Sequence, residues 1–207
     1  MDATHGEELS WAFEQLVEAL SERCQVSVLK EKPPDLRLLS ENDAFVVICA
    51  SKPWDDAEVS TVRRYVESHG GILLILRFGG SKPGHLNKLL SPYDLSVDRS
   101  TLKKSAFLRH DFQGSGPLEG VGSLSAGTGV WEHDRGLTAS GGAEIVLQFK
   151  QAKLRARTAS RKGIVYLISC PNVLRKKDLE RGGNMTFLAN LLERLATPWV
   201  HKVKIKV

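Results

Sequence analysis

The stretch DAFVVICASKPWDDAEVSTVRRYVESHGGILLILRFGG, Asp43–Gly80, decides the fold. It opens with an apolar, β-branched run over 43–51 and closes with a second apolar run over 71–78, as expected of strands buried on both faces. The segment between them is amphipathic, has acidic residues in its first turn and ends at Gly70, which predicts a helix. A strand, a helix and a strand joined by short connections predict a βαβ unit and hence a parallel sheet.

The remaining segments extend this pattern to one α/β domain spanning residues 1–207. Helical spacing of apolar residues predicts a helix near each end of the chain, and apolar or alternating runs predict further strands. The predicted elements are helices over 7–23 and 182–199, strands over 25–30 and 163–171, and a hairpin over 143–159. Residues 101–142 are rich in glycine and serine and show no clear helical periodicity.

The C-terminal stretch VHKVKIKV, residues 200–207, alternates β-branched residues with lysines. This alternation predicts a one-sided, lysine-guarded edge strand over 202–207. A doubly wound domain usually opens with a strand, whereas the first predicted helix here starts a few residues after Met1. We therefore expect the C-terminal strand to pair with the sheet where an opening strand is short or absent, or with a second copy in a homodimer. A rival explanation is that a few residues of the natural start are missing.

Composition is that of an ordinary globular protein, with 42% hydrophobic and 26% charged residues. No apolar run approaches the roughly 20 residues needed to span a bilayer. The polar, acidic N-terminus does not resemble a secretory signal, so the sequence predicts a cytoplasmic protein without a membrane span. The three cysteines, Cys24, Cys49 and Cys170, are dispersed without ligand spacing, which argues against a metal site.

The net charge of +5 is unevenly distributed, because residues 150–181 are strongly basic. Such a region can bind nucleic acid, an acidic protein or an anionic lipid surface. Aromatic residues are nearly absent from it, so it offers no stacking platform for single-stranded nucleic acid. A solvated basic face is the favoured interpretation, and nucleic-acid binding through 150–181 is kept as an alternative.

The glycine-rich turn RFGGSKPG, residues 77–84, follows the strand over 71–78, where α/β proteins often place their chemistry. It lacks the spacing of a P-loop and of a dinucleotide-binding fingerprint. Ser81 lies one or two residues late for a nucleophile elbow, and no histidine can be paired with it from the sequence. A divergent hydrolase that uses Ser81 or His5 is therefore an alternative, and no catalytic residue is predicted.

The segment DATHGEE, residues 2–8, gathers acidic side chains and His5 before the first predicted helix. Such a cluster could ligate a divalent cation. Acidic residues also suit the first turn of a helix, where they interact favourably with its dipole. The helical interpretation is favoured, so no metal is predicted here.

These segments together resemble the class I glutamine amidotransferase-like superfamily. The resemblance is carried by residues 2–8, 43–80, 85–97, 163–171 and 182–196. It is nearest to a non-catalytic branch that includes the N-terminal domain of an intraflagellar transport B-complex subunit, gliding-motility transporter accessory proteins and prokaryotic domains of unknown function. The resemblance implies a flavodoxin-like three-layer α/β sandwich with a mainly parallel sheet.

Active members of the superfamily carry a cysteine in a GxCxG elbow after the strand matching 71–78, and a His-Pro-Glu after a late strand. In this sequence the elbow reads RFGGS, and the late strand continues as PNVLRKKD over 171–178. The thiolate nucleophile and its base are both lacking, and Cys170 lies on the late strand, so it does not replace the elbow cysteine. Glutaminase chemistry is therefore not expected, and neither is a cofactor.

The resulting prediction is a non-catalytic domain that binds a protein partner or a carbohydrate-like ligand at the carboxyl edge of the sheet. Lys82, His85 and the basic run 175–177 would give this edge a positive character suited to an acidic partner. The candidate binding residues are Asp2, His5, Gly79, Gly80, Ser81, Lys82, His85 and Asn172.

Overall fold

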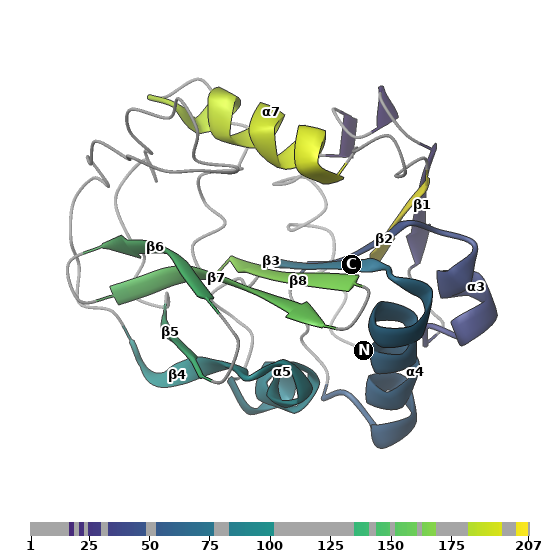
Figure 1. The fold of residues 1–207 in the computed structure, drawn as a ribbon, viewed down its shortest axis with the longest axis horizontal. Helices are drawn as coiled ribbons and strands as arrows, with labels where there is room; N and C mark the ends of the chain where they lie inside the picture. The colour runs from purple at the N-terminus through teal and green to yellow at the C-terminus, as the bar shows by residue number, and fades with distance from the viewer. Residues whose placement is uncertain are drawn as a thin grey trace, which may run out of the picture.

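A computed structural model describes most of the predicted elements, and Figure 1 shows their arrangement. The described residues are 17–18, 21–22, 25–29, 33–48, 53–76, 83–101, 135–140, 144–149, 152–160, 163–168, 182–195 and 202–206.

The βαβ unit predicted from residues 43–80 is present. It consists of β2 (Ala44–Ile48), α4 (Asp56–His69) and β3 (Ile72–Leu76), and the two strands pair in parallel. α4 begins with a capping box: the Asp55 side chain accepts a hydrogen bond from the Glu58 backbone N–H at 2.7 Å, and Glu58 accepts one from the Asp55 N–H at 3.1 Å. The helix ends at Gly70, whose φ of 76° is left-handed and suits glycine.

In the described part of the chain, a seven-stranded sheet has the order β1-β9-β2-β3-β8-β7-β6. The new strands are β1 (Gln25–Leu29), β9 (Lys202–Lys206), β8 (Gly163–Ile168), β7 (Ala152–Ser160) and β6 (Glu144–Phe149). The first five strands in this order pair in parallel. β8, β7 and β6 pair antiparallel, which confirms the predicted hairpin. The mixed α/β architecture and its parallel sheet are consistent with a flavodoxin-like fold.

β9 corrects the prediction of an edge strand over 202–207. It pairs with β1 on one side and with β2 on the other, so it lies inside the sheet. In the flavodoxin-like strand order 2-1-3-4-5, this is the position of the first strand. With both sides paired, β9 presents no free edge, and a homodimer formed by pairing along that edge is incompatible with this arrangement. The prediction that the C-terminal strand pairs with the sheet in place of an opening strand is confirmed, whereas its placement at an edge was wrong, because alternation describes the two faces of a strand and not its neighbours.

The other described helices follow the strands. They are α3 (Leu36–Ser40), α5 (Pro83–Leu90) with the short 3₁₀ helix η1 (Ser91–Tyr93), and α7 (Asn184–Leu195). In Figure 1, α7 lies on one side of the sheet, and α4 and α5 lie on the other. β4 (Leu95–Thr101) and β5 (Arg135–Ala139) form a separate two-stranded antiparallel sheet. Strand β5 was not predicted, since it falls in the stretch without periodicity.

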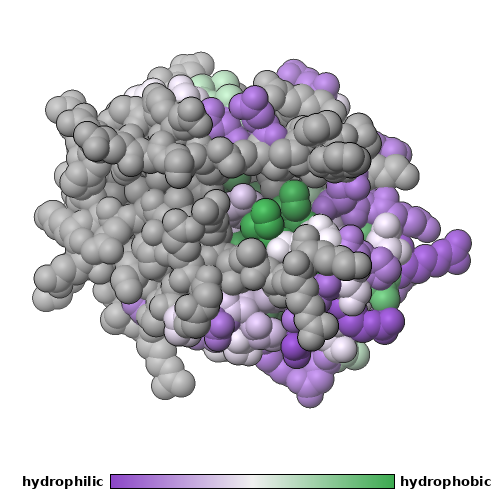
Figure 2. Space-filling view, in the orientation of Figure 1, coloured by the Kyte–Doolittle hydropathy of each residue, from purple (hydrophilic) through white to green (hydrophobic). Residues whose placement is uncertain are grey.

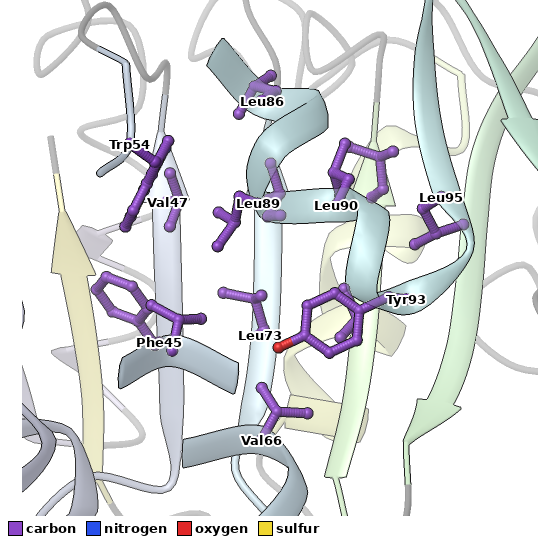
Figure 3. Packing of buried hydrophobic residues seen from close by; sticks show 14 of the residues in the cluster. Phe45, Val47, Trp54, Val66, Leu73, Leu86, Leu89, Leu90, Tyr93 and Leu95 are labelled. Carbon is purple, nitrogen blue, oxygen red and sulfur yellow. The ribbon is translucent and has the colours of Figure 1, made fainter. Parts of the chain in front are cut away.

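The main core lies between the sheet and the helices α4 and α5 (Figure 3). Alternate residues of β2 and β3, such as Phe45 and Leu73, point into it, and Leu89 of α5 packs against them. All three of these side chains are fully buried. The remaining cluster members from the sheet and these two helices include Val47, Ile75, Val165, Leu167, Val62, Tyr65, Val66, Leu86 and Leu90. This packing fixes where α4 and α5 begin relative to the strand ends.

Candidate functional site

The carboxyl ends of the five parallel strands meet at one edge of the sheet, because parallel strands in register all run the same way. Their last described residues are Leu29, Lys206, Ile48, Leu76 and Ile168. In open α/β sheets, ligands bind outside this edge. The helices that follow β2 and β3 begin here, so the first turns of α4 and α5 form the described part of its surroundings.

His85 is the one predicted binding residue that falls among the described residues. It lies in the first turn of α5, directly before the buried Leu86. Its ring is half-buried, and its Nδ1 atom is shielded from solvent without a hydrogen-bond partner in the described part of the structure. A shielded ring nitrogen without a partner is costly, and a hydrogen bond from a bound group would relieve that cost. His85 is therefore the described polar group best placed to contact a ligand at this edge.

Trp54 is a second residue at this edge, and it is not among the binding residues predicted from the sequence. It lies between β2 and the start of α4, and its side chain is 3% exposed. Figure 3 shows its ring beside Val47, at the same end of the core cluster as Leu86. A tryptophan placed immediately before an Asp cap, as in the sequence PWDD, is the signal that could have indicated it. Trp54 gives the edge an apolar base between β2 and α4.

An ion pair joins the first turn of α4 to the last turn of α5. Lys88 of α5 forms an ion pair with Asp56 of α4, with 2.8 Å between Nζ and Oδ1. The Asp56 side chain is 96% exposed, so this ion pair is solvated and contributes little stability by itself. It joins the exposed surfaces of α4 and α5 close to the edge. The pair adds one charge of each sign here, and the basic residues predicted for this edge, Lys82 and 175–177, lie outside the described residues.

The other predicted site residues cannot be compared with the structure. Asp2, His5, Gly79, Gly80, Ser81, Lys82 and Asn172 lie outside the described residues. Within the described ranges, no group of three or more His, Cys, Asp or Glu side chains could hold a metal ion. No helix within those same ranges is long and apolar enough to cross a membrane.

Figure 2 shows how polarity is distributed over the face seen in Figure 1. Apolar atoms are visible in a hollowed area near the centre of this face, and strongly hydrophilic residues lie beside them.

No protein-family model and no curated protein matches the sequence. Solved structures do match. The mmIFT52 N-terminal domain superimposes with a TM-score of 0.70 at 16% identity, over 91% of this chain and 92% of that one. The cytoplasmic protein STM1381 from Salmonella typhimurium LT2 gives a TM-score of 0.60 at 14% identity, over 88% of this chain and 86% of that one.

A third match is part of a much larger protein. The exo-β-1,4-mannosidase Op5Man5 from Opitutaceae bacterium strain TAV5 gives a TM-score of 0.50 at 15% identity, over 90% of this chain but only 29% of the enzyme. At such identities the likeness concerns the fold alone. The chain is thus an α/β domain that shares its fold with the mmIFT52 N-terminal domain and with STM1381.

Proposed function

We propose that this chain is a non-catalytic interaction domain with the three-layer, class I glutamine amidotransferase-like fold, and that it recognises a protein partner at the carboxyl edge of its sheet. The observation that carries the proposal is His85. Its Nδ1 atom is shielded from solvent at the edge where five parallel strands end, and it has no hydrogen-bond partner among the described residues. A partner group that reached Nδ1 on binding would supply that hydrogen bond.

The non-catalytic character rests on the sequence of the turn after β3. This turn reads RFGGS, where active amidotransferases carry a cysteine, and the segment after β8 lacks a histidine and a glutamate at the required spacing. An acyl-transfer enzyme needs both an activated nucleophile and a base. The likeness to the mmIFT52 N-terminal domain over nearly the whole of both chains supports a self-contained domain of this kind.

The preferred partner is an acidic protein. The chain has a net charge of +5, and Lys82 and the run 175–177 follow strands that end at this edge. Opposite charges on two surfaces increase the rate and specificity of their association. A carbohydrate-like ligand is the competing candidate, and the likeness to part of a mannosidase is compatible with it.

The test is quantitative affinity capture with three variants of the chain. His85→Ala removes the imidazole, and Gly84→Glu adds an acidic side chain beside it. A Cβ at Gly84 would meet no atom within 4 Å, so the second variant should fold normally. The control is Arg64→Gln, which lowers the net charge by one unit, as Gly84→Glu does, but at an exposed position in the second half of α4. Thermal unfolding of each variant verifies that it is folded.

We expect an acidic protein that the wild type and Arg64→Gln capture equally, and that both edge variants lose. Binding of the same protein to all four chains would place the interaction elsewhere and refute the proposal. Retention of mannose oligosaccharides by the wild type, with no captured protein, would favour the carbohydrate-like ligand instead.

A further inference from the structure

β9 differs in composition from the parallel strands beside it. β2, β3 and β8 read AFVVI, ILLIL and GIVYLI, without a charged residue, as is typical of strands inside a parallel sheet. β9 reads KVKIK, so three of its five residues are lysines. A strand with this composition has less apolar surface to bury than its neighbours, and burial of apolar surface is the main source of its stabilisation. From this composition we expect β9 to gain less from apolar burial than β2, β3 and β8.

β1 depends on β9 for its place in the sheet. Within the described strands, β1 pairs with β9 alone, from Gln25 opposite Lys202 to Leu29 opposite Lys206. β9 in turn pairs with β2, from Ala44 opposite Val203 to Val47 opposite Lys206. Among the described strands, the backbone hydrogen bonds between β1 and the rest of the sheet thus run through the lysine-rich strand β9. If β9 leaves, β1 loses its described pairing and one edge of β2 is uncovered.

We propose that β9 acts as a latch: it leaves the slot between β1 and β2 in a local opening that also releases β1, while β2, β3 and β8 stay paired. Proteins open in cooperative units whose free energies lie below that of global unfolding. The unit here joins two segments from opposite ends of the sequence, residues 25–29 and 202–206. Its opening changes the order of the sheet without touching the core between β2, β3, α4 and α5.

Hydrogen exchange on the full chain tests the latch. The amides of β1 and β9 should exchange with a common opening equilibrium, about tenfold or more faster than those of β3 and β8. A disulfide between β9 and β2 then locks the latch. Ala44 and Val203 are register partners on adjacent strands, and such neighbours lie within the range that a disulfide spans. The variant is Ala44→Cys with Val203→Cys, in a chain whose three native cysteines are replaced by serine.

The decisive comparison is between the oxidised and the reduced forms of this variant. Oxidation should slow exchange in β1 as well as in β9, although the disulfide does not touch β1. The matched control combines Ala44→Cys with Ile72→Cys, which are register partners between β2 and β3. Its oxidation should leave exchange in β1 unchanged. Circular dichroism verifies that both variants are folded.

Three results would overturn the latch. Protection of β1 and β9 equal to that of β3 would mean that no separate opening exists. Slower exchange in β9 alone after oxidation would mean that β1 is held by other contacts. If the disulfide between positions 44 and 203 fails to form while the control disulfide forms, the position of β9 between β1 and β2 is contradicted.

Discussion

The side chain of Asn87 is joined to the backbone of Val97 by two hydrogen bonds. The Val97 N–H donates to Oδ1 of Asn87 at 2.7 Å, and Nδ2 of Asn87 donates to the Val97 carbonyl oxygen at 3.0 Å. A single amide side chain from α5 therefore satisfies both backbone groups of one residue in β4. These two hydrogen bonds hold the two-stranded sheet against α5. They also occupy the backbone groups of Val97, so a further strand cannot pair with β4 at this residue.

Asn87→Ala should lower the free energy of unfolding by about 1–3 kcal/mol, because it leaves the partly buried N–H and carbonyl of Val97 without these partners. Urea denaturation measures the change. Ser91→Ala is the control, since it removes one exposed hydrogen bond, from the Ser91 hydroxyl to the Lys88 carbonyl, and should change stability far less. Equal unfolding midpoints for Asn87→Ala and the wild type would show that the two hydrogen bonds between Asn87 and Val97 contribute nothing to stability.

Gly163→Ala should destabilise the protein by about 1–3 kcal/mol or more, because an added Cβ would overlap the carbonyl oxygens of Gly71 and Val66. These are backbone atoms at the start of β3 and at the end of α4, so they cannot rotate aside. Gly84→Ala is the opposite case: its Cβ enters open space within α5 and should stabilise the helix by up to about 1 kcal/mol. Thermal unfolding of the two variants should therefore shift in opposite directions, and a shift in the same direction would contradict this packing.

The sequence predicted the parts of the fold that depend on local patterns. The βαβ unit over 43–80 is marked by two uncharged apolar runs and by a helix with a cap at Asp55 and a stop at Gly70. The pairing of β9 with the sheet was predicted, but its two neighbouring strands were not, because alternation along a strand carries no information on which strands flank it. β5 was missed for a related reason: it is held by pairing with β4, a strand more than thirty residues earlier in the chain.

In the candidate site, too, local sequence patterns predicted some features, whereas others depend on tertiary packing. His85 could be named from the sequence because it follows a buried strand and a glycine-rich turn. The shielding of its Nδ1 atom could not be predicted from the sequence, because it depends on how α5 packs against the sheet. Trp54 was overlooked because its position at the strand ends emerges only from the parallel register and from the packing of the core.

Asp55→Ala should cost about 0.5–2 kcal/mol, because it removes the capping box of α4, in which Asp55 accepts the Glu58 N–H at 2.7 Å. The adjacent Asp56→Ala is the matched control. Asp56 contributes a highly exposed ion pair with Lys88, and such pairs contribute at most about 1 kcal/mol. Urea denaturation should thus rank Asp55→Ala as the less stable variant, and Asp55→Asn should recover most of the loss. The reverse ranking would mean that the ion pair between α4 and α5 matters more than the cap.

The protein should lose stability at alkaline pH through two buried tyrosines. Burial raises the pKa of Tyr65 and of Tyr93 well above the usual value, and the nearby carboxylates Asp43 and Glu67 raise them further. The neutral phenols are thus favoured by the folded state. Their contribution is complete below about pH 10, where tyrosine ionises in the unfolded chain, and it is lost as the pH rises toward the folded-state pKa.

Tyrosinate absorbance and circular dichroism, recorded together against pH, test this coupling. Ionisation of Tyr65 and Tyr93 should coincide with unfolding, and their ionisation in a chain that keeps its native circular dichroism would contradict it. Tyr65→Phe sharpens the test. At neutral pH it should cost about 1 kcal/mol, because it removes the 3.1 Å hydrogen bond from the Tyr65 hydroxyl to the Asn42 carbonyl. Above pH 10 the stability of this variant should decline less steeply than that of the wild type, because one of the two coupled phenols is gone.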